Sequence, residues 1–214
     1  MDINERRLLE KKTLILLGIF MTALIAANLL GGKITTILGV SVSVGIFAYP
    51  LTFICTDVIE EVRGRKITKQ FVNAGILALL ITMALVYIGI HLPPAARYES
   101  DAAYVTIFSS SMRMIVASLI AFLLAQHHDI WAFNFWKRKT KGKMLWFRNN
   151  MSTIVSQFID TSIFMFIAFY HLTPKFTAGF ILTLIFPYWL FKVFFAFADT
   201  PLVYLGVKWL KPKG

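Results

Sequence analysis

The chain has few of the residues that build disulfide-stabilised, metal-binding or highly charged soluble proteins. Its 214 residues include a single cysteine, Cys55, so an intrachain disulfide is impossible. Charged residues make up only 15% of the chain, and just 11 of them are acidic. The adjacent His127 and His128 with Asp129 fit a solvated helix end better than a metal site, so we predict no metal.

The motifs of common enzyme classes are also missing. The sequence contains no Gly-rich phosphate loop, no serine nucleophile elbow and no HExxH zinc motif. A membrane enzyme would have to use acids and bases buried in the membrane instead. We therefore predict no catalytic residues and no cofactor, and transport or solute binding is the more natural use of such groups.

Apolar residues are abundant instead. The chain is 57% hydrophobic, holds 20 Phe and has a mean hydropathy of +0.69. These values are typical of an integral membrane protein, whose helices need about 20 apolar residues to cross the bilayer. We predict an all-α membrane protein with six transmembrane helices in a single integral membrane domain, residues 1–214. The predicted spans are 13–30, 40–59, 71–92, 104–125, 152–170 and 179–198.

Basic residues give the orientation of these spans. They gather before the first span, between the second and third, in a basic connection over residues 126–150, and at the C-terminal end. The connections on the other side hold only Lys33, Arg97 and Lys175. Because basic loops stay in the cytoplasm, both termini are predicted to be cytoplasmic, in a multi-pass protein of the cell (inner) membrane. The acids near the N-terminus do not fit the basic start of a signal peptide, so we expect the first helix to be retained.

The net charge of +11 makes nucleic acid a partner to consider. In the connection over residues 126–150, aromatic residues alternate with Lys and Arg, a pattern that also occurs in RNA-binding segments. Beside a cytoplasmic membrane face, the same pattern favours anchoring to anionic lipid. We therefore predict membrane lipid, and no nucleic acid, as the partner of this segment.

Several polar residues fall inside or at the ends of the predicted spans. Pro50 lies near the centre of the second span, with Asp57, Glu60 and Glu61 toward its end. Carboxylates are costly in an apolar segment, so such a stretch lines a polar cavity more often than it faces lipid. Asp57 is a cavity candidate and Glu60 a weaker one, whereas Glu61 is placed to pair with Arg65 at the cytoplasmic end.

The fourth, fifth and sixth spans carry the remaining charges. Asp160 and Arg113 are predicted at similar heights, with Lys192 about one turn deeper. Gln157 shares a helical face with Asp160, which predicts a polar wall. Two interpretations stay open, since these groups either contact a ligand or only pair to hold helices together. Two further candidates for substrate binding, an outer amide and an aromatic ring, are Asn28 and Tyr188.

An ordered series of residues resembles the queuosine-precursor transporter family, which is also described as a vitamin-uptake-type family. The resemblance spans nearly the whole chain, and Arg63 departs from it where the family often has an aromatic residue. The matching positions are Asn28 with Lys33, Pro50 to Phe53 with Asp57, Glu61 and Gly64, Arg113 with Ala117 and Ser118, Gln126 with Asp129, Trp146 with Arg148 and Asn149, Ser152, Gln157, Asp160 with Thr161, Phe164, Lys192, Thr200 with Pro201, and Tyr204.

The resemblance implies a six-helix bundle similar to the substrate-binding subunits of energy-coupling vitamin importers. It also implies uptake of a small-molecule deazapurine, 7-cyano-7-deazaguanine or 7-aminomethyl-7-deazaguanine, for tRNA modification. Two alternatives stay open: a binding subunit for another vitamin-like solute that requires a separate ATP-driven coupling module, and a membrane-embedded lipid-modifying enzyme. A homo-oligomer is compatible both with the importer and with the binding subunit.

Overall fold

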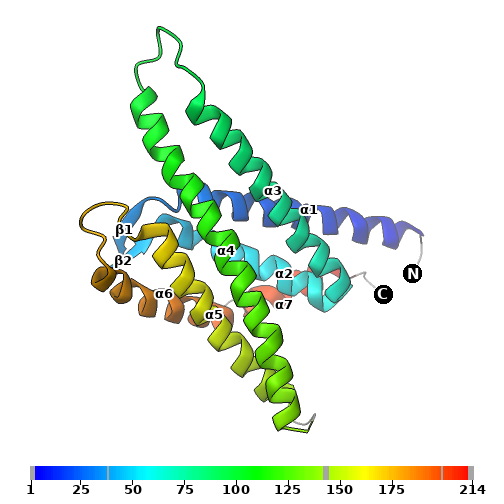
Figure 1. Ribbon diagram of the computed structural model, residues 1–214. Helices are drawn as coiled ribbons and strands as arrows, with labels where there is room; N and C mark the ends of the chain where they lie inside the picture. Colours follow the sequence, from blue (N-terminus) through cyan, green and yellow to red (C-terminus); the bar gives the residue numbers. More distant parts are fainter. Residues whose placement is uncertain (1–2, 38, 142–144, 199, 212–214) are drawn as a thin grey trace. The chain divides into compact units, whose positions relative to one another are not determined.

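A computed structural model describes residues 3–37, 39–141, 145–198 and 200–211 (Figure 1). Most of these residues are helical, as the composition predicts. In chain order the elements are α1 (Ile3–Leu30), β1 (Ile34–Ile37), β2 (Val40–Ser43), the short 3-10 helix η1 (Val44–Phe47), α2 (Tyr49–Arg63), α3 (Arg65–His91), α4 (Asp101–Lys139), α5 (Leu145–Phe169), α6 (Ala178–Ala198) and α7 (Thr200–Leu210). The two short strands form one hairpin.

The chain divides into two compact units. The first contains α1, η1, α2, α3, α7 and the beginning of α4 up to Met112. The second contains the rest of α4 from Arg113, with α5 and α6 as far as Phe194. Each unit is described on its own below.

The first unit has a core made by four helices. Its buried cluster comprises Leu16 and Phe20 of α1, Cys55, Val58 and Ile59 of α2, Phe71 of α3, and Leu210 of α7. Leu16, Phe20, Ala23 and Ala27 recur every three or four residues, which places them on one face of α1. The rings of Phe20 and Phe71 lie 6.1 Å apart between centroids and join α1 to α3. Burial of this apolar face holds α1, α2, α3 and α7 together.

The segment predicted as the second span differs from a continuous helix. Its first residues form β2 and η1, and α2 begins only at Tyr49. Pro50 lies in the first turn of α2, where a missing N–H and a fixed φ are compatible with the helix. Pro50 therefore lies at the start of a helix and does not kink its centre. The prediction that Pro50 lies near the centre of a helical span is wrong.

The basic segment over residues 126–150 also differs from a simple connection. Helix α4 continues to Lys139, and α5 already begins at Leu145. Trp131 and Phe135 stack at 5.7 Å, and the Lys139 ammonium lies 5.9 Å from the Phe135 ring. This i to i+4 spacing lines up aromatic and basic side chains on one face of a helix. The short helix α7, which follows Ala198, is an element that the sequence analysis missed.

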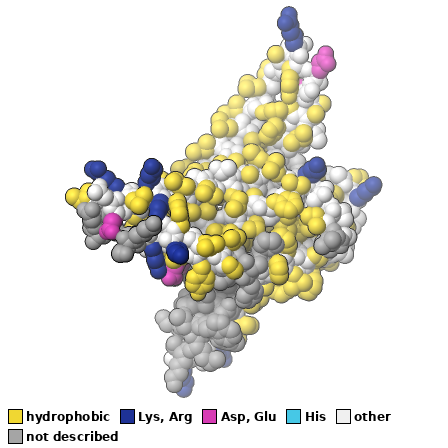
Figure 2. Space-filling view, turned by 180° about the vertical axis from the view of Figure 1, so that it is seen from behind, with side chains coloured by type: hydrophobic (Ala, Val, Ile, Leu, Met, Phe, Trp, Pro, Cys, Tyr) yellow, Lys and Arg dark blue, Asp and Glu magenta, His cyan; other side chains and the backbone are white. Residues whose placement is uncertain are grey.

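Three described helical segments are long and apolar enough to cross a membrane: Ile3–Leu30, Lys66–His91 and Asp101–Ala125. Two shorter apolar segments follow, Ile154–Phe169 in α5 and Ala178–Phe194 in α6. In the view of Figure 2, hydrophobic side chains cover much of the surface of the described residues. These features are those of a helical, multi-pass membrane protein.

At Gly45, η1 lies close against the backbone of α1. A methyl group at this position would lie 2.5 Å from the backbone oxygen of Ala27. We expect Gly45→Ala to lower the free energy of unfolding by about 1–3 kcal/mol, because a backbone oxygen cannot move aside as a flexible side chain does. Thermal unfolding of the detergent-purified protein measures the effect.

The matched control is Gly18→Ala in α1, where nothing lies within 4 Å of the added methyl group. That variant is expected to match or exceed the wild type in stability, because alanine favours a helix by up to about 1 kcal/mol over glycine. Equal stability of the two variants would contradict the close contact.

Candidate functional site

The second unit contains an ion pair between two apolar helices. The Lys192 ammonium of α6 donates to an Asp160 carboxylate oxygen of α5 at 2.6 Å. Lys192 is only 7% exposed, and the Asp160 side chain is 22% exposed. Asp160 is the one charged residue in the apolar stretch Ile154–Phe169, and Lys192 is the one charged residue in the apolar stretch Ala178–Phe194. Each charge therefore has its counter-charge on the neighbouring helix, which offsets the cost of placing it in an apolar segment.

Aromatic contacts fix the same two helices against each other. The Trp189 indole N–H donates to the Ile154 carbonyl oxygen at 3.2 Å. The rings of Phe158 and Trp189 meet edge to face at 5.7 Å. Because Trp189 and Lys192 are three residues apart on α6, both contacts come from one face of that helix. Together they align α5 and α6 around the ion pair.

Arg113 bonds to backbone carbonyl groups at the end of α5. Its Nε donates to the Ile167 carbonyl oxygen at 2.6 Å, and its terminal NH2 group donates to the Tyr170 carbonyl oxygen. Ile167 and Tyr170 flank the C-terminal end of α5, where carbonyl groups have no partner within the helix. Asp160 lies seven residues before Ile167, about 10 Å along the helix axis. The guanidinium of Arg113 thus caps α5, and substrate contact by Arg113 stays a prediction.

Two other predicted residues of the second unit lie near the pair along the chain. Gln157 is partly buried one turn before Asp160 on α5, and Tyr188 is buried on α6 beside Pro187. Both lie within four residues along the chain from a member of the pair. The set Asp160, Gln157, Lys192 and Tyr188 therefore comes from one pair of helices, with a carboxylate, an amide, an ammonium and a phenol.

Thr161 was not singled out as a ligand-binding residue by the sequence analysis. Its side chain is 1% exposed, and its hydroxyl has no hydrogen-bond partner within the described part of the chain. Threonine in a helix commonly bonds the carbonyl oxygen four residues earlier, so an unpartnered buried hydroxyl is unusual. The only sequence signal for it is its position directly after an aspartate in an apolar segment.

Three predicted residues belong to the first unit. Asn28 is buried in α1, and its amide donates to the Leu24 carbonyl oxygen at 2.9 Å, a bond within the same helix. Asp57 and Glu60 are both exposed on α2. Substrate contact by these three residues stays a prediction.

His127 contacts the backbone of its own helix, α4, and His128 contacts α5. A ring nitrogen of His127 lies 2.7 Å from the Leu123 carbonyl oxygen, and one of His128 lies 2.9 Å from the Ser156 hydroxyl. The Asp129 side chain lies outside the described part of the structure. No cluster of three or more metal-ligating side chains occurs among the described residues.

Long apolar helices, with a charge pair between two of them, are features of a helical membrane protein with polar groups held in its interior. A family whose description reads "Putative vitamin uptake transporter" matches residues 43–206, and the chain belongs to this family. The protein is therefore a transporter and not an enzyme, which removes the lipid-modifying enzyme as an alternative.

Two curated relatives extend the comparison. The chain is 34% identical over 154 residues to the "Probable queuosine precursor transporter" of Bacillus subtilis (strain 168), covering 71% of this chain and 67% of that protein. It is 28% identical over 172 residues to the "Queuosine precursor transporter" of Escherichia coli (strain K12), covering 78% of this chain and 73% of that protein. No solved structure gives a significant match.

Removing one partner of the ion pair is expected to destabilise the protein. Lys192→Met leaves Asp160 without its counter-charge, a change that costs about 3–5 kcal/mol at a fully buried site. The partial exposure of Asp160 places the expected loss below that range. The double variant Asp160→Asn/Lys192→Met carries neither charge and is expected to recover most of the lost stability. Unfolding in detergent measures both, and equal losses in the single and double variants would contradict the pairing.

Arg113→Lys is expected to loosen the end of α5. Lysine keeps the charge but lacks the planar fork with which arginine reaches two carbonyl groups at once. Hydrogen exchange of residues 166–172 is expected to speed up, while exchange around Asp160 changes little. Uniform acceleration along the whole of α5 would argue against a local cap.

Proposed function

We propose that this chain is a membrane importer of queuosine precursors, namely 7-cyano-7-deazaguanine or 7-aminomethyl-7-deazaguanine. The names of the two curated relatives support the solute class. The observation that carries the proposal is the partly exposed carboxylate of Asp160, held by Lys192 between two apolar helices. Such a group is positioned to exchange part of its protein contacts for a polar solute.

The chemistry of a deazaguanine matches this set of side chains. Its guanine-like edge presents neighbouring N–H donors, which one carboxylate accepts in pairs, and an oxygen suited to an amide or a cation. In the proposed complex Asp160 accepts the donors, while Gln157 and Lys192 contact the oxygen or the substituent. The ring of Tyr188, which is buried in the structure, is proposed to stack against the base in the complex.

The proposed topology has six spans with both termini in the cytoplasm of the inner membrane. The spans follow α1, η1 with α2, α3, the first part of α4, α5 and α6. The positive-inside distribution of Lys and Arg supports this orientation. The proposed shape is similar to that of the substrate-binding subunits of vitamin importers.

Restoration of tRNA modification tests the proposal in cells. A strain that cannot make queuosine, supplied with the free base, is expected to regain the modified tRNA when it expresses this protein. Asp160→Asn is expected to lower uptake about tenfold to a hundredfold, because a hydrogen bond to a charged group contributes about 1.5–3 kcal/mol. Normal membrane levels without any recovered modification would overturn the proposed function.

A second measurement separates binding from stability. If Asp160 and Lys192 only hold α5 and α6 together, the double variant Asp160→Asn/Lys192→Met regains both stability and uptake. If they contact the solute, it regains stability but stays inactive. Loss of uptake in the stable double variant is the result that we expect.

Reconstitution of the purified chain in liposomes tests whether it acts alone. Uptake of a labelled deazapurine by these liposomes, without any other protein, is expected for an importer that works by itself. Binding of the deazapurine without uptake would instead favour a subunit that needs a separate ATP-driven coupling module.

A further inference from the structure

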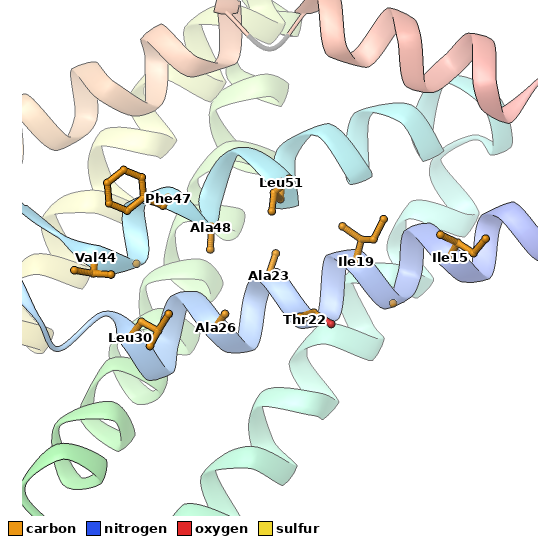
Figure 3. Close-up of a pocket in the computed structure, with 12 residues that line it drawn as sticks. Ile15, Ile19, Thr22, Ala23, Ala26, Leu30, Val44, Phe47, Ala48 and Leu51 are labelled. Carbon is orange, nitrogen blue, oxygen red and sulfur yellow. The ribbon is translucent and has the colours of Figure 1, made fainter.

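An apolar groove runs along α1 in the first unit. It has a volume of about 590 Å³ and lies between α1, from Ile15 to Leu30, and the segment from Val44 to Leu51 (Figure 3). Fifteen residues of helix correspond to about 22 Å, whereas one leaflet of the hydrocarbon core is about 15 Å thick. The groove is therefore long enough for one acyl chain.

The lining chemistry excludes a deazapurine as the occupant. Thr22 is the one polar side chain among the described residues that line the groove. A purine-like base carries donors and acceptors around its edge, and burying them without partners is unfavourable. A hydrocarbon chain needs no such partners. The groove thus differs in kind from the site around Asp160.

Two cations continue the line of the groove beyond its N-terminal end. Lys11 lies four residues before Ile15 on α1, and Arg7 lies four residues before Lys11, so all three share one face of the helix. Both cations are exposed, and neither forms an ion pair within the described residues. The neighbouring Lys12 turns elsewhere, since it donates to the Trp209 carbonyl oxygen of α7.

We propose that this groove binds one acyl chain of an anionic phospholipid, with the headgroup phosphate held by Arg7 and Lys11. α1 is long and apolar enough to cross a membrane, so its exposed face meets lipid. Basic residues at the end of such a helix attract anionic headgroups. The apolar groove and the cations in line with it supply the two parts that a phospholipid requires.

A second protein helix fits the groove less well. Helices that associate in membranes approach through small residues along the contact. Small residues do line part of this groove, since Gly18, Thr22 and Ala26 recur every four residues on α1. Large apolar side chains project beside them, with Leu30 55% exposed, Phe47 62% and Leu51 48%. A protein helix would also leave the two cations without an anion. A flexible chain with a phosphate at its end satisfies both features.

Gly18 offers a way to fill the groove without disturbing the fold. It lines the groove, and nothing lies within 4 Å of a side chain started there. Gly18→Phe is therefore expected to place a ring in the groove. The matched control is Leu14→Phe, which puts a ring on the same helix at an exposed position outside the groove.

The experiment uses the full chain in nanodiscs of phosphatidylglycerol and phosphatidylcholine in equal amounts, followed by native mass spectrometry of the released protein. The wild type and Leu14→Phe are expected to retain phosphatidylglycerol in preference to phosphatidylcholine. Gly18→Phe is expected to retain several-fold less of either lipid. The double variant Arg7→Gln/Lys11→Gln is expected to keep bound lipid but lose the preference for phosphatidylglycerol.

Thermal unfolding confirms that each variant is folded before lipid is counted. Equal lipid retention by Gly18→Phe and Leu14→Phe would overturn the groove as the binding site. An unchanged preference in the Arg7→Gln/Lys11→Gln variant would overturn the headgroup contact. A wild-type dimer that Gly18→Phe converts to a monomer, with no change in bound lipid, would show that a second copy fills the groove and would also overturn the proposal.

Discussion

The organisation of this protein depends on one constraint: a charge inside an apolar segment needs a partner. Asp160 and Lys192 are the only charges in their apolar stretches, and they meet across α5 and α6. The same requirement explains Arg113, whose guanidinium bonds to two carbonyl groups at the end of α5. One rule, that polar groups in a low-dielectric region are satisfied from within the protein, thus positions both α4 and α6 against α5.

The sequence predicts the helices better than their ends. Apolar runs locate α1, α3, α4, α5 and α6, because hydrophobicity over about 20 residues is a strong signal. The signal fails around residues 40–48, where apolar residues build a strand and a 3-10 helix that a hydropathy argument cannot distinguish from an α-helix. It fails again after residue 125, because the basic residues that end an apolar run do not end the helix itself.

The residues of the candidate site are likewise predicted only in part from the sequence. Asp160 and Lys192 are identified from their residue type and depth alone, and the structure confirms that they pair. Arg113 is identified as a polar group in an apolar segment, but the two carbonyl groups that it bonds are not predicted, since sequence depth does not show in which direction a long side chain extends. Thr161 is missed altogether, because a threonine is common in apolar helices and only its lack of a partner makes it unusual.

The ion pair between α5 and α6 also has a consequence for how the protein enters the membrane. Asp160 is synthesised 32 residues before Lys192, so the ribosome releases α5 with a carboxylate that has no counter-charge. An isolated aspartate at the centre of a helix costs about 2.5–3.5 kcal/mol on insertion scales, and α6 taken alone bears a similar cost for lysine. If α5 and α6 both cross the membrane, as proposed, they are most stable when they enter it together as a hairpin, because each then supplies the counter-charge of the other.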